Sequence, residues 1–257
     1  MRARRLTAAA SVAALAVLSL AACGRSAPGV AAYVGDRTFS VDRVNEIYDD
    51  AQTQYADVVR SQQEQMGATP APEELRSSVT RQDVVNLLVS VELGKRLADE
   101  KGIEVPDMLT PEQLQQQLQL PASTEYVQLW GEWADLSDAL QKQLPPAELS
   151  DDAVMAVYQA IAQTGAIRAG LSVAEVRQAF GEGGFVRSAT ALSSALRAEA
   201  EKTGASINPK YGPIGVPSVV STGQSLVFYS LPFINHDGPV TDISTPEAPE
   251  TGDPVTH

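Results

Sequence analysis

Apolar side chains recur at alternating spacings of three and four residues along residues 41–65, which is the pattern of one face of an amphipathic helix. Ser40 precedes this segment and is a candidate N-cap. Two short β-favouring runs, residues 32–34 and 37–39, flank a Gly-Asp turn at residues 35–36 and predict a small hairpin. The helical stripe comprises Val41, Val44, Tyr48, Ala51, Tyr55 and Val58. The folded chain is therefore expected to open with a hairpin that leads into a long helix.

Further helical segments are expected downstream. In residues 80–102 the apolar side chains cover almost the whole circumference, so this helix should lie at the centre of the molecule with other helices around it. Thr110 and Ser172 each stand three residues before a Gln or Glu, and this capping-box pattern marks two helix starts. The expected segments are 80–102, a helix starting at 110, 124–144, 150–162, 172–180 and 188–202.

The C-terminal part of the chain changes character. Residues 218–220 and 226–229 predict two short strands around a turn at residues 222–224. From Pro232 onward Pro, Asp, Glu and Thr dominate without any Lys or Arg, so residues 232–257 are expected to form a disordered acidic tail. The sequence thus predicts a mainly α fold, in which a small β element of short N- and C-terminal strands joins the two ends of one helical domain, residues 31–231.

The first 22 residues have the pattern of a bacterial lipoprotein signal peptide. Three arginines within the first five residues precede an uncharged apolar stretch, residues 6–22, and the segment ends in Leu20-Ala21-Ala22-Cys23. This lipobox pattern predicts cleavage between Ala22 and Cys23 and attachment of a diacylglycerol to the thiol of Cys23. Residues 23–30 would then be a lipidated tether that holds the protein at the extracytoplasmic face of the bacterial cell membrane. The alternative is an ordinary signal peptide, or an uncleaved anchor, with an accidental cysteine.

Charge and cysteine content exclude several classes of function. The chain has 19 basic and 32 acidic residues, a formal net charge of −13, and Cys23 as its single cysteine. An acidic chain of this kind is not expected to bind nucleic acid, and one cysteine cannot form a disulfide framework or a Cys-rich metal site. Removal of residues 1–22 takes away three arginines and no acid, so the charge of the mature chain becomes −16. Such a charge favours basic or neutral partners.

Residues that could carry catalysis or hold a metal are scarce. The two histidines, His236 and His257, both fall in the expected tail, which cannot preorganise a catalytic triad. The acidic pairs Asp49-Asp50 and Asp151-Asp152 lie outside any EF-hand pattern, and acids at a helix start commonly stabilise the helix dipole. No catalytic residue, metal site or cofactor is therefore expected.

Two segments carry a resemblance to a known family. Residues 31–41, AAYVGDRTFSV, resemble the opening of the N-terminal domain of the SurA/PrsA group of extracytoplasmic chaperones, in which a strand, a Gly turn and a second strand lead into a long helix. The segment Ile207-Asn208-Pro209-Lys210-Tyr211-Gly212 is similar to the strand entry of lipoproteins that carry the same domain. The resemblance covers residues 30–230 in organisation and only these two segments in motif.

The resemblance implies a chaperone or foldase factor whose partners are unfolded or partly folded secreted polypeptides. Many members also carry a parvulin prolyl isomerase domain with two core histidines, which this chain lacks outside its tail, so the chain is expected not to be an enzyme. Two alternatives remain open: an adaptor lipoprotein that binds one folded envelope partner, and a degenerate prolyl isomerase.

Five aromatic residues are candidates for contact with such clients. Tyr126, Trp130 and Trp133 are spaced to share one helix face, and Tyr48 and Tyr55 belong to the stripe of the first long helix. Aromatic side chains bury a large area with limited loss of conformational entropy, which suits a client-binding groove. Ordinary core packing is the alternative for all five.

Overall fold

The protein is mainly α-helical with a small β element, which confirms the expected fold class. The computed structural model describes residues 27–221 and 226–234. The helices are α1 (Val41–Gln65), α2 (Arg81–Lys101), α3 (Pro111–Leu118), α4 (Glu125–Gln143), α5 (Asp151–Gln163), α6 (Val173–Phe180) and α7 (Gly184–Thr203). The strands are β1 (Val30–Val34), β2 (Arg37–Ser40), β3 (Ser206–Ile207), β4 (Ile214–Ser221) and β5 (Leu226–Ile234).

The helix ends follow local capping chemistry. The Ser40 hydroxyl accepts a hydrogen bond from the backbone N–H of Arg43 at 3.0 Å, which starts α1 where the sequence predicts it. Capping boxes are present at the starts of α2, α3 and α6, and left-handed glycines at 102 and 204 end α2 and α7. These helices therefore begin or end at residues that satisfy their own terminal backbone groups.

The β element is divided between two separate sheets: the N-terminal hairpin pairs with β3, whereas the strands expected at residues 218–220 and 226–229 pair with each other. Strands β2, β1 and β3 form one antiparallel sheet in that order, with Ala32 paired to Ile207. Asn208 lies just after β3 and holds it in place. Its backbone N–H donates to the carbonyl oxygen of Ala31 at 2.9 Å, and its side-chain amide donates to that of Val30 at 2.7 Å. The segment that resembles a strand entry thus connects the C-terminal part of the chain to the first strand.

Several boundaries differ from the sequence-based expectation. Helix α7 begins at Gly184 rather than at residue 188, and β4 begins at Ile214 rather than at residue 218. Strand β5 runs to Ile234, so the first three residues assigned to the tail belong to the sheet instead. The reason is burial: Ile214, Val216 and Phe233 are almost fully enclosed in the core, which outweighs the low strand propensity of the glycine and proline residues among them.

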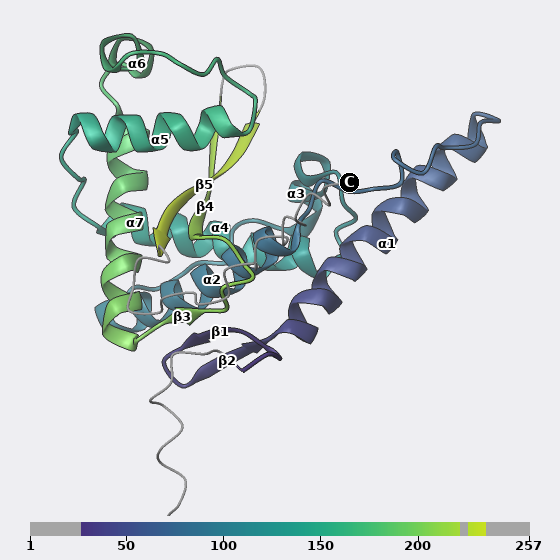
Figure 1. The fold of residues 1–257 in the computed structure, drawn as a ribbon, viewed down its shortest axis with the longest axis horizontal. Helices are drawn as coiled ribbons and strands as arrows, with labels where there is room; N and C mark the ends of the chain where they lie inside the picture. Colours follow the sequence, from purple (N-terminus) through teal and green to yellow (C-terminus); the bar gives the residue numbers. More distant parts are fainter. Residues whose placement is uncertain (1–26, 222–225, 235–257) are drawn as a thin grey trace, which may run out of the picture.

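Helix α2 lies at the centre of the molecule, as its nearly all-round apolar pattern predicts. It contacts α1, α4, α7, β1 and β4, and most of its length is buried. In Figure 1, α5, α6 and α7 lie on one side of the β4–β5 hairpin, while α1 extends away on the other side. The first half of α1 packs on the core through Val44, Ile47 and Ala51. Its second half, which contains the exposed residue Val58, forms a projecting arm.

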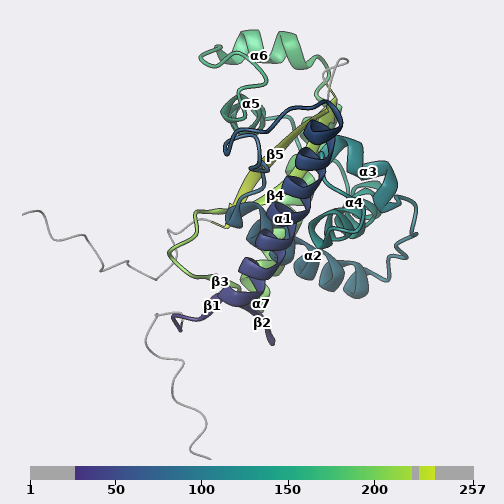
Figure 2. The same cartoon turned by 90° about the vertical axis from the view of Figure 1, so that its right-hand side faces the viewer.

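Two apolar clusters meet at the β4–β5 hairpin. The larger cluster is built from α1, α2, α4, β1 and the later part of α7, and it includes Val216 of β4 and Phe233 of β5. The smaller cluster is built from α5, α6 and α7 and includes Val227, Tyr229 and Leu231 of β5. Figure 2 shows the hairpin between α5 on one side and α3 and α4 on the other. The hairpin is therefore the seam that joins the two halves of the fold.

Candidate functional site

A cleft of about 770 Å³ opens along this seam. Its walls come from the start of α2, the end of α3, the first half of α4, the end of α5 and the β4–β5 hairpin. These elements are far apart in the sequence, and the hairpin brings them together. The volume lies within the range typical of ligand-binding clefts.

One wall of the cleft is aromatic. Tyr126 and Trp130 stand one turn apart on α4, and Phe228 comes from β5. The neighbouring Tyr229 faces the opposite side of the strand and packs in the smaller apolar cluster. The rings of Trp130 and Phe228 meet edge to face with centroids 5.3 Å apart. This arrangement uses the favourable edge-to-face geometry of aromatic pairs. Tyr126 and Trp130 belong to the larger core cluster and are each 6% exposed, so only a small part of each ring reaches the cleft.

Both tyrosines of the cleft lining are buried, and burial raises the pKa of their hydroxyls. It raises the pKa of the Tyr126 hydroxyl well above the usual value of 10, and the nearby negative charge of Asp83 raises it further. Burial also raises the pKa of Tyr229 to about 12. Both side chains are neutral at physiological pH, as an ordinary tyrosine is, and each is only 6% exposed.

Asn86 fixes the position of the hairpin relative to α2. This side chain is buried, and its Oδ1 accepts from the side-chain amide of Gln82 at 2.9 Å and from the backbone N–H of Gly215 at 3.2 Å. Its amide donates to the hydroxyl of Ser230 at 3.2 Å. One side chain thus ties both strands of the hairpin to the central helix, on the polar side of the cleft.

Among the described residues that line the cleft, Asp83 carries the only charge. Its carboxylate accepts from the backbone N–H of Thr80 at 2.9 Å and from the Thr80 hydroxyl at 2.7 Å, in the capping box of α2. The carboxylate is therefore held in one place and has no basic partner within the cleft lining. The electrostatics of the cleft favour a neutral or basic guest over an acidic one.

The five aromatic candidates fall into three environments. Tyr126 and Trp130 line the cleft. Trp133 is fully buried, and its indole N–H donates to the carbonyl oxygen of Pro217 at 2.7 Å, so it holds β4 against α4. Tyr48 and Tyr55 are partly buried against the main core and lie outside the cleft lining. Contact between a client and any of these residues stays a prediction.

Four residues of the cleft lining are not among the sequence-based candidates for client contact: Phe228, Tyr229, Asp83 and Asn86. Phe228 and Tyr229 were assigned to a strand, in which alternate residues face opposite sides, and that pattern does not tell which side borders a cleft. Asp83 has the sequence pattern of a helix cap, and Asn86 lies inside a helix that is otherwise apolar. Only the packing of the hairpin against α2 and α4 reveals their common location.

A second cavity of about 500 Å³ lies beside α4 and the segment that precedes α3. Asp135 of α4 lines it and is buried, with its carboxylate accepting from the backbone N–H of Met108 at 3.0 Å and of Leu109 at 3.2 Å. These hydrogen bonds compensate for the loss of hydration of the buried carboxylate. They also hold the segment that precedes α3 against α4. The cavity is smaller than the cleft, and none of the aromatic candidates lines it.

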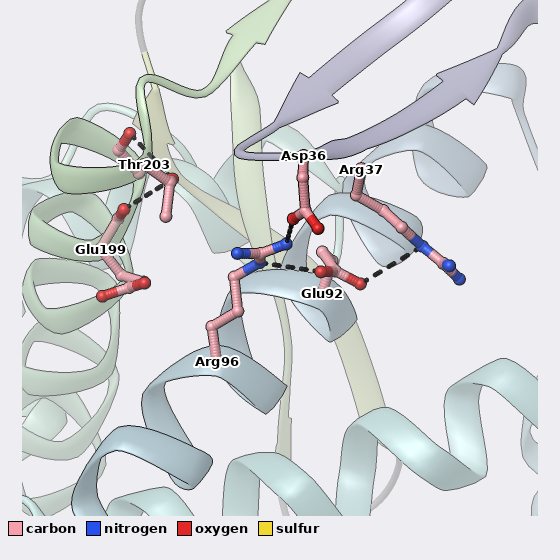
Figure 3. A network of polar contacts seen from close by, with 7 residues as sticks. Asp36, Arg37, Glu92, Arg96, Glu199 and Thr203 are labelled. Carbon is pink, nitrogen blue, oxygen red and sulfur yellow. Dashed lines mark hydrogen bonds and ion pairs between the residues drawn. The ribbon is translucent and has the colours of Figure 1, made fainter.

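The β1–β2 hairpin is fastened to α2 by a network of charged side chains (Figure 3). Asp36 at the hairpin turn pairs with Arg96, whose Nε donates to Glu92 at 2.8 Å. Arg37 approaches the other oxygen of Glu92 at 3.7 Å. The hydrogen bond from Arg96 holds the pKa of Asp36 below its usual value of 3.8. This network fixes the end of the domain that follows the expected lipid tether.

Other parts of the sequence-based interpretation fall outside the described residues. They include the signal peptide at 1–22, Cys23 with its lipobox, both histidines and the tail from residue 235. Within the described part of the chain, no group of three or more His, Cys, Asp or Glu side chains is placed to hold a metal ion. No helix in that part is long and apolar enough to span a membrane.

Comparison with known proteins adds no assignment. No family model, no curated protein and no solved structure matches this chain.

Proposed function

We propose that this protein is a lipid-anchored, extracytoplasmic chaperone of the SurA/PrsA kind that holds apolar segments of unfolded secreted proteins and has no prolyl isomerase activity. The observation that carries the proposal is the cleft at the hairpin, where Tyr126, Trp130 and Phe228 form an aromatic wall. An apolar wall suits clients that differ in sequence, because apolar burial is not directional. Polar side chains such as Asn86, Gln163 and Ser230 also line the cleft and can hydrogen-bond to a client.

The sequence supports the location. A leader that ends in the lipobox Leu20-Ala21-Ala22-Cys23 would place the chain outside the cytoplasm and attach it to lipid through Cys23. Acyl chains contribute about 0.8 kcal/mol per buried CH₂ group, so more than one chain gives durable anchoring. The chaperone would then work where secreted polypeptides emerge, and the membrane itself is its second partner.

A substitution that fills the cleft tests the proposal. Gln163 is the last residue of α5, is exposed and lines the cleft, so Gln163→Trp is expected to occupy the space without disturbing the core. Gln143 is the last residue of α4, is exposed and lies outside the cleft, so Gln143→Trp is a matched control. The soluble domain from residue 24 onward is expected to suppress aggregation of a chemically unfolded secreted protein, measured by light scattering. Gln163→Trp should lose most of this activity, whereas Gln143→Trp should keep it.

Several outcomes would contradict the proposal. Equal suppression by the two variants would mean that clients do not use the cleft, and no suppression by the wild-type domain would remove the chaperone function itself. The domain is also expected not to accelerate cis/trans exchange of an Xaa-Pro peptide, and acceleration above buffer would favour the degenerate isomerase. If cross-linking in cells captured one stoichiometric folded partner instead of many secreted clients, the chain would be an adaptor.

A further inference from the structure

Side chains from the central helices cover the outer backbone groups of β4 at Gly215 and Pro217. The Gly215 N–H donates to Asn86 of α2, and the Pro217 carbonyl accepts from Trp133 of α4. In an antiparallel pair, alternate residues direct their N–H and C=O groups toward the partner strand and away from it. Gly215 and Pro217 therefore point away from β5, which also explains why a proline is tolerated at this position.

The same alternation identifies the outward-pointing residues of β5. Pro217 is paired with Ser230, and Val219 is paired with Phe228. Since Pro217 and Val219 point away from β5, the backbone groups of Ser230 and Phe228 point away from β4. Within residues 27–221 and 226–234, no hydrogen bond joins the backbone N–H or C=O of either residue to another element. This part of β5 is a free strand edge.

The free edge is short and borders the cleft. Phe228 and Ser230 both line the cleft and are partly buried. Toward the C-terminal end, Pro232 has no N–H, and the Phe233 carbonyl accepts from Nε of Arg197 at 3.1 Å, so that end of the strand offers less to a partner. Free edges invite pairing with another chain, and native folds usually cover or interrupt them. In β5 the edge is interrupted at Pro232 and Phe233, but not at Ser230 and Phe228, which lie beside the aromatic wall of the cleft.

We propose that the client binds as an extended segment that adds a strand to β5 at Phe228 and Ser230. This inference rests on the proposed function and specifies the client: a polypeptide in extended conformation, with apolar side chains at alternate positions and a Lys or Arg. Hydrogen bonds from β5 recognise the backbone, which every client has, and apolar side chains pack on Trp130 and Phe228. The basic residue is selected by Asp83, the only charge among the described residues of the cleft lining.

Peptides with blocked backbone amides test the strand pairing on the wild-type domain, so that folding of a variant is not an issue. The probe is a fluorescein-labelled peptide of roughly six residues that alternates Val or Phe with Ser and Lys. Two derivatives carry N-methyl groups on every second amide, in the two possible phases. Only one edge of a strand can pair with β5, so one phase is expected to weaken binding about tenfold or more while the other binds as the parent does. Equal affinities for the two phases, measured by fluorescence anisotropy, would overturn strand pairing.

A matched pair of variants tests the same edge from the side of the protein. Ser230→Pro removes the outward N–H and places a ring on the edge, while the pairing with β4 does not use this N–H. Val219→Pro is the matched control, because Val219 also directs its N–H away from the partner strand, is exposed and lies outside the cleft lining. Ser230→Pro is expected to lower the affinity of the parent peptide about tenfold, and Val219→Pro is expected to retain it, with circular dichroism and thermal unfolding confirming that both fold. Equal affinities of the two folded variants would contradict the proposal.

The outcomes separate this inference from the proposed function. If the parent peptide binds and neither N-methylation nor Ser230→Pro matters, the cleft binds clients without strand pairing. If no peptide binds and aggregation is not suppressed, the proposed function itself is wrong.

Deletion of residues 235–257 is expected to leave the affinity unchanged, and a rise would assign the edge to the chain's own C-terminal segment. A wild-type dimer that dissociates on Ser230→Pro would assign it to a second copy. Either result would contradict the proposal that a client segment pairs with the free edge of β5.

Discussion

Gly94 lies where α2 crosses α4, beneath the cleft. A Cβ atom at this position would lie 2.7 Å from Cδ2 of Leu136 and 3.2 Å from Cζ3 of Trp133. Both neighbours are buried, and Trp133 also binds the Pro217 carbonyl, so neither can move freely. The missing side chain of Gly94 therefore sets how closely the two helices approach and, through Trp133, where the hairpin lies.

Gly94→Ala is expected to lower the free energy of unfolding by about 1–3 kcal/mol, the usual cost of overpacking a core. Gly131 provides the control, because it is also a helical glycine, but a Cβ there would lie at ordinary contact distance, 3.4 Å from the Leu109 carbonyl oxygen. Gly131→Ala should be neutral or stabilise the protein by up to about 1 kcal/mol, through the higher helix propensity of alanine. Chemical denaturation of the two variants measures the contrast. Equal effects would show that the α2–α4 contact is looser than this distance indicates.

Single residues also show how far the sequence predicts the site. Tyr126 and Trp130 could be selected as candidates because their helical spacing is visible in the sequence, and both line the cleft. The same spacing selects Trp133, which is buried beneath the hairpin, because periodicity identifies an apolar face but not what packs against it. Phe228 completes the aromatic wall from a strand that lies almost a hundred residues later in the chain. Only the tertiary fold brings these side chains together.

At the scale of elements, the network at the β1–β2 turn makes the stability of the hairpin depend on pH. The pKa of Asp36 is held below its usual value of 3.8 chiefly by the hydrogen bond from Arg96. A depressed pKa in the folded state means that the carboxylate stabilises the fold above about pH 4. This stabilisation is lost as the pH falls through the folded-state pKa.

Asp36→Asn tests this dependence. The variant is expected to be less stable than the wild type at neutral pH, and the difference should shrink as the pH falls below about 4, where the wild-type carboxylate becomes protonated. Because Asp36 and Arg96 are near the surface, the difference should also shrink at high salt. Thermal unfolding over a pH series measures it, with hydrogen exchange at Val34 and Arg37, the pair that flanks the turn, as a local report on the hairpin. A difference that is constant down to pH 3 would mean that the pair does not stabilise the hairpin.

Helices were predicted more accurately than strands, for a physical reason. The start and end of a helix depend on local capping residues, which here include Ser40 and Thr80 at helix starts and Gly102 at a helix end. Strands β4 and β5 contain Gly215, Pro217 and Pro232, which have low strand propensity, and the helices that cover them, such as α2 and α5, lie far from them in the sequence. The strands form because the pair buries its apolar residues between two helical layers. That stabilisation comes from packing and is not visible in the local sequence.

At the scale of the whole molecule, the cleft lies where the two apolar clusters of the fold meet. The clusters share the β4–β5 hairpin and α7, which contributes Leu196 to the larger cluster and Val186 to the smaller one. Because α7 also contacts α2 and α4, it fixes the hairpin relative to the central helices, whereas α5 borders the cleft from the smaller cluster. The β4–β5 hairpin thus packs in both clusters and also forms one wall of the proposed client site.

The net charge of the whole molecule adds a long-range field to this local geometry. The full chain carries −13, and the expected cleavage after Ala22 would make it −16. Such a field accelerates the encounter with basic clients and slows the encounter with acidic ones. The association rate of a Lys-containing peptide is therefore expected to fall when ionic strength rises from about 0.1 M to about 1 M, where the Debye length shortens from about 10 Å to about 3 Å. The rate for an uncharged peptide should change little.

Local recognition by Asp83 can be separated from this field by two variants with the same change in charge. Asp83→Asn removes the charge in the cleft and keeps an oxygen that can accept from Thr80. Glu112→Gln removes a charge in the first turn of α3, outside the cleft lining. Both should slow the association of the Lys-containing peptide equally, because the distant field depends on net charge. Only Asp83→Asn should also speed its dissociation, by several-fold, because only this variant loses a partner of the bound lysine. Stopped-flow fluorescence gives both rates, and equal dissociation rates for the two variants would mean that Asp83 does not contact the client.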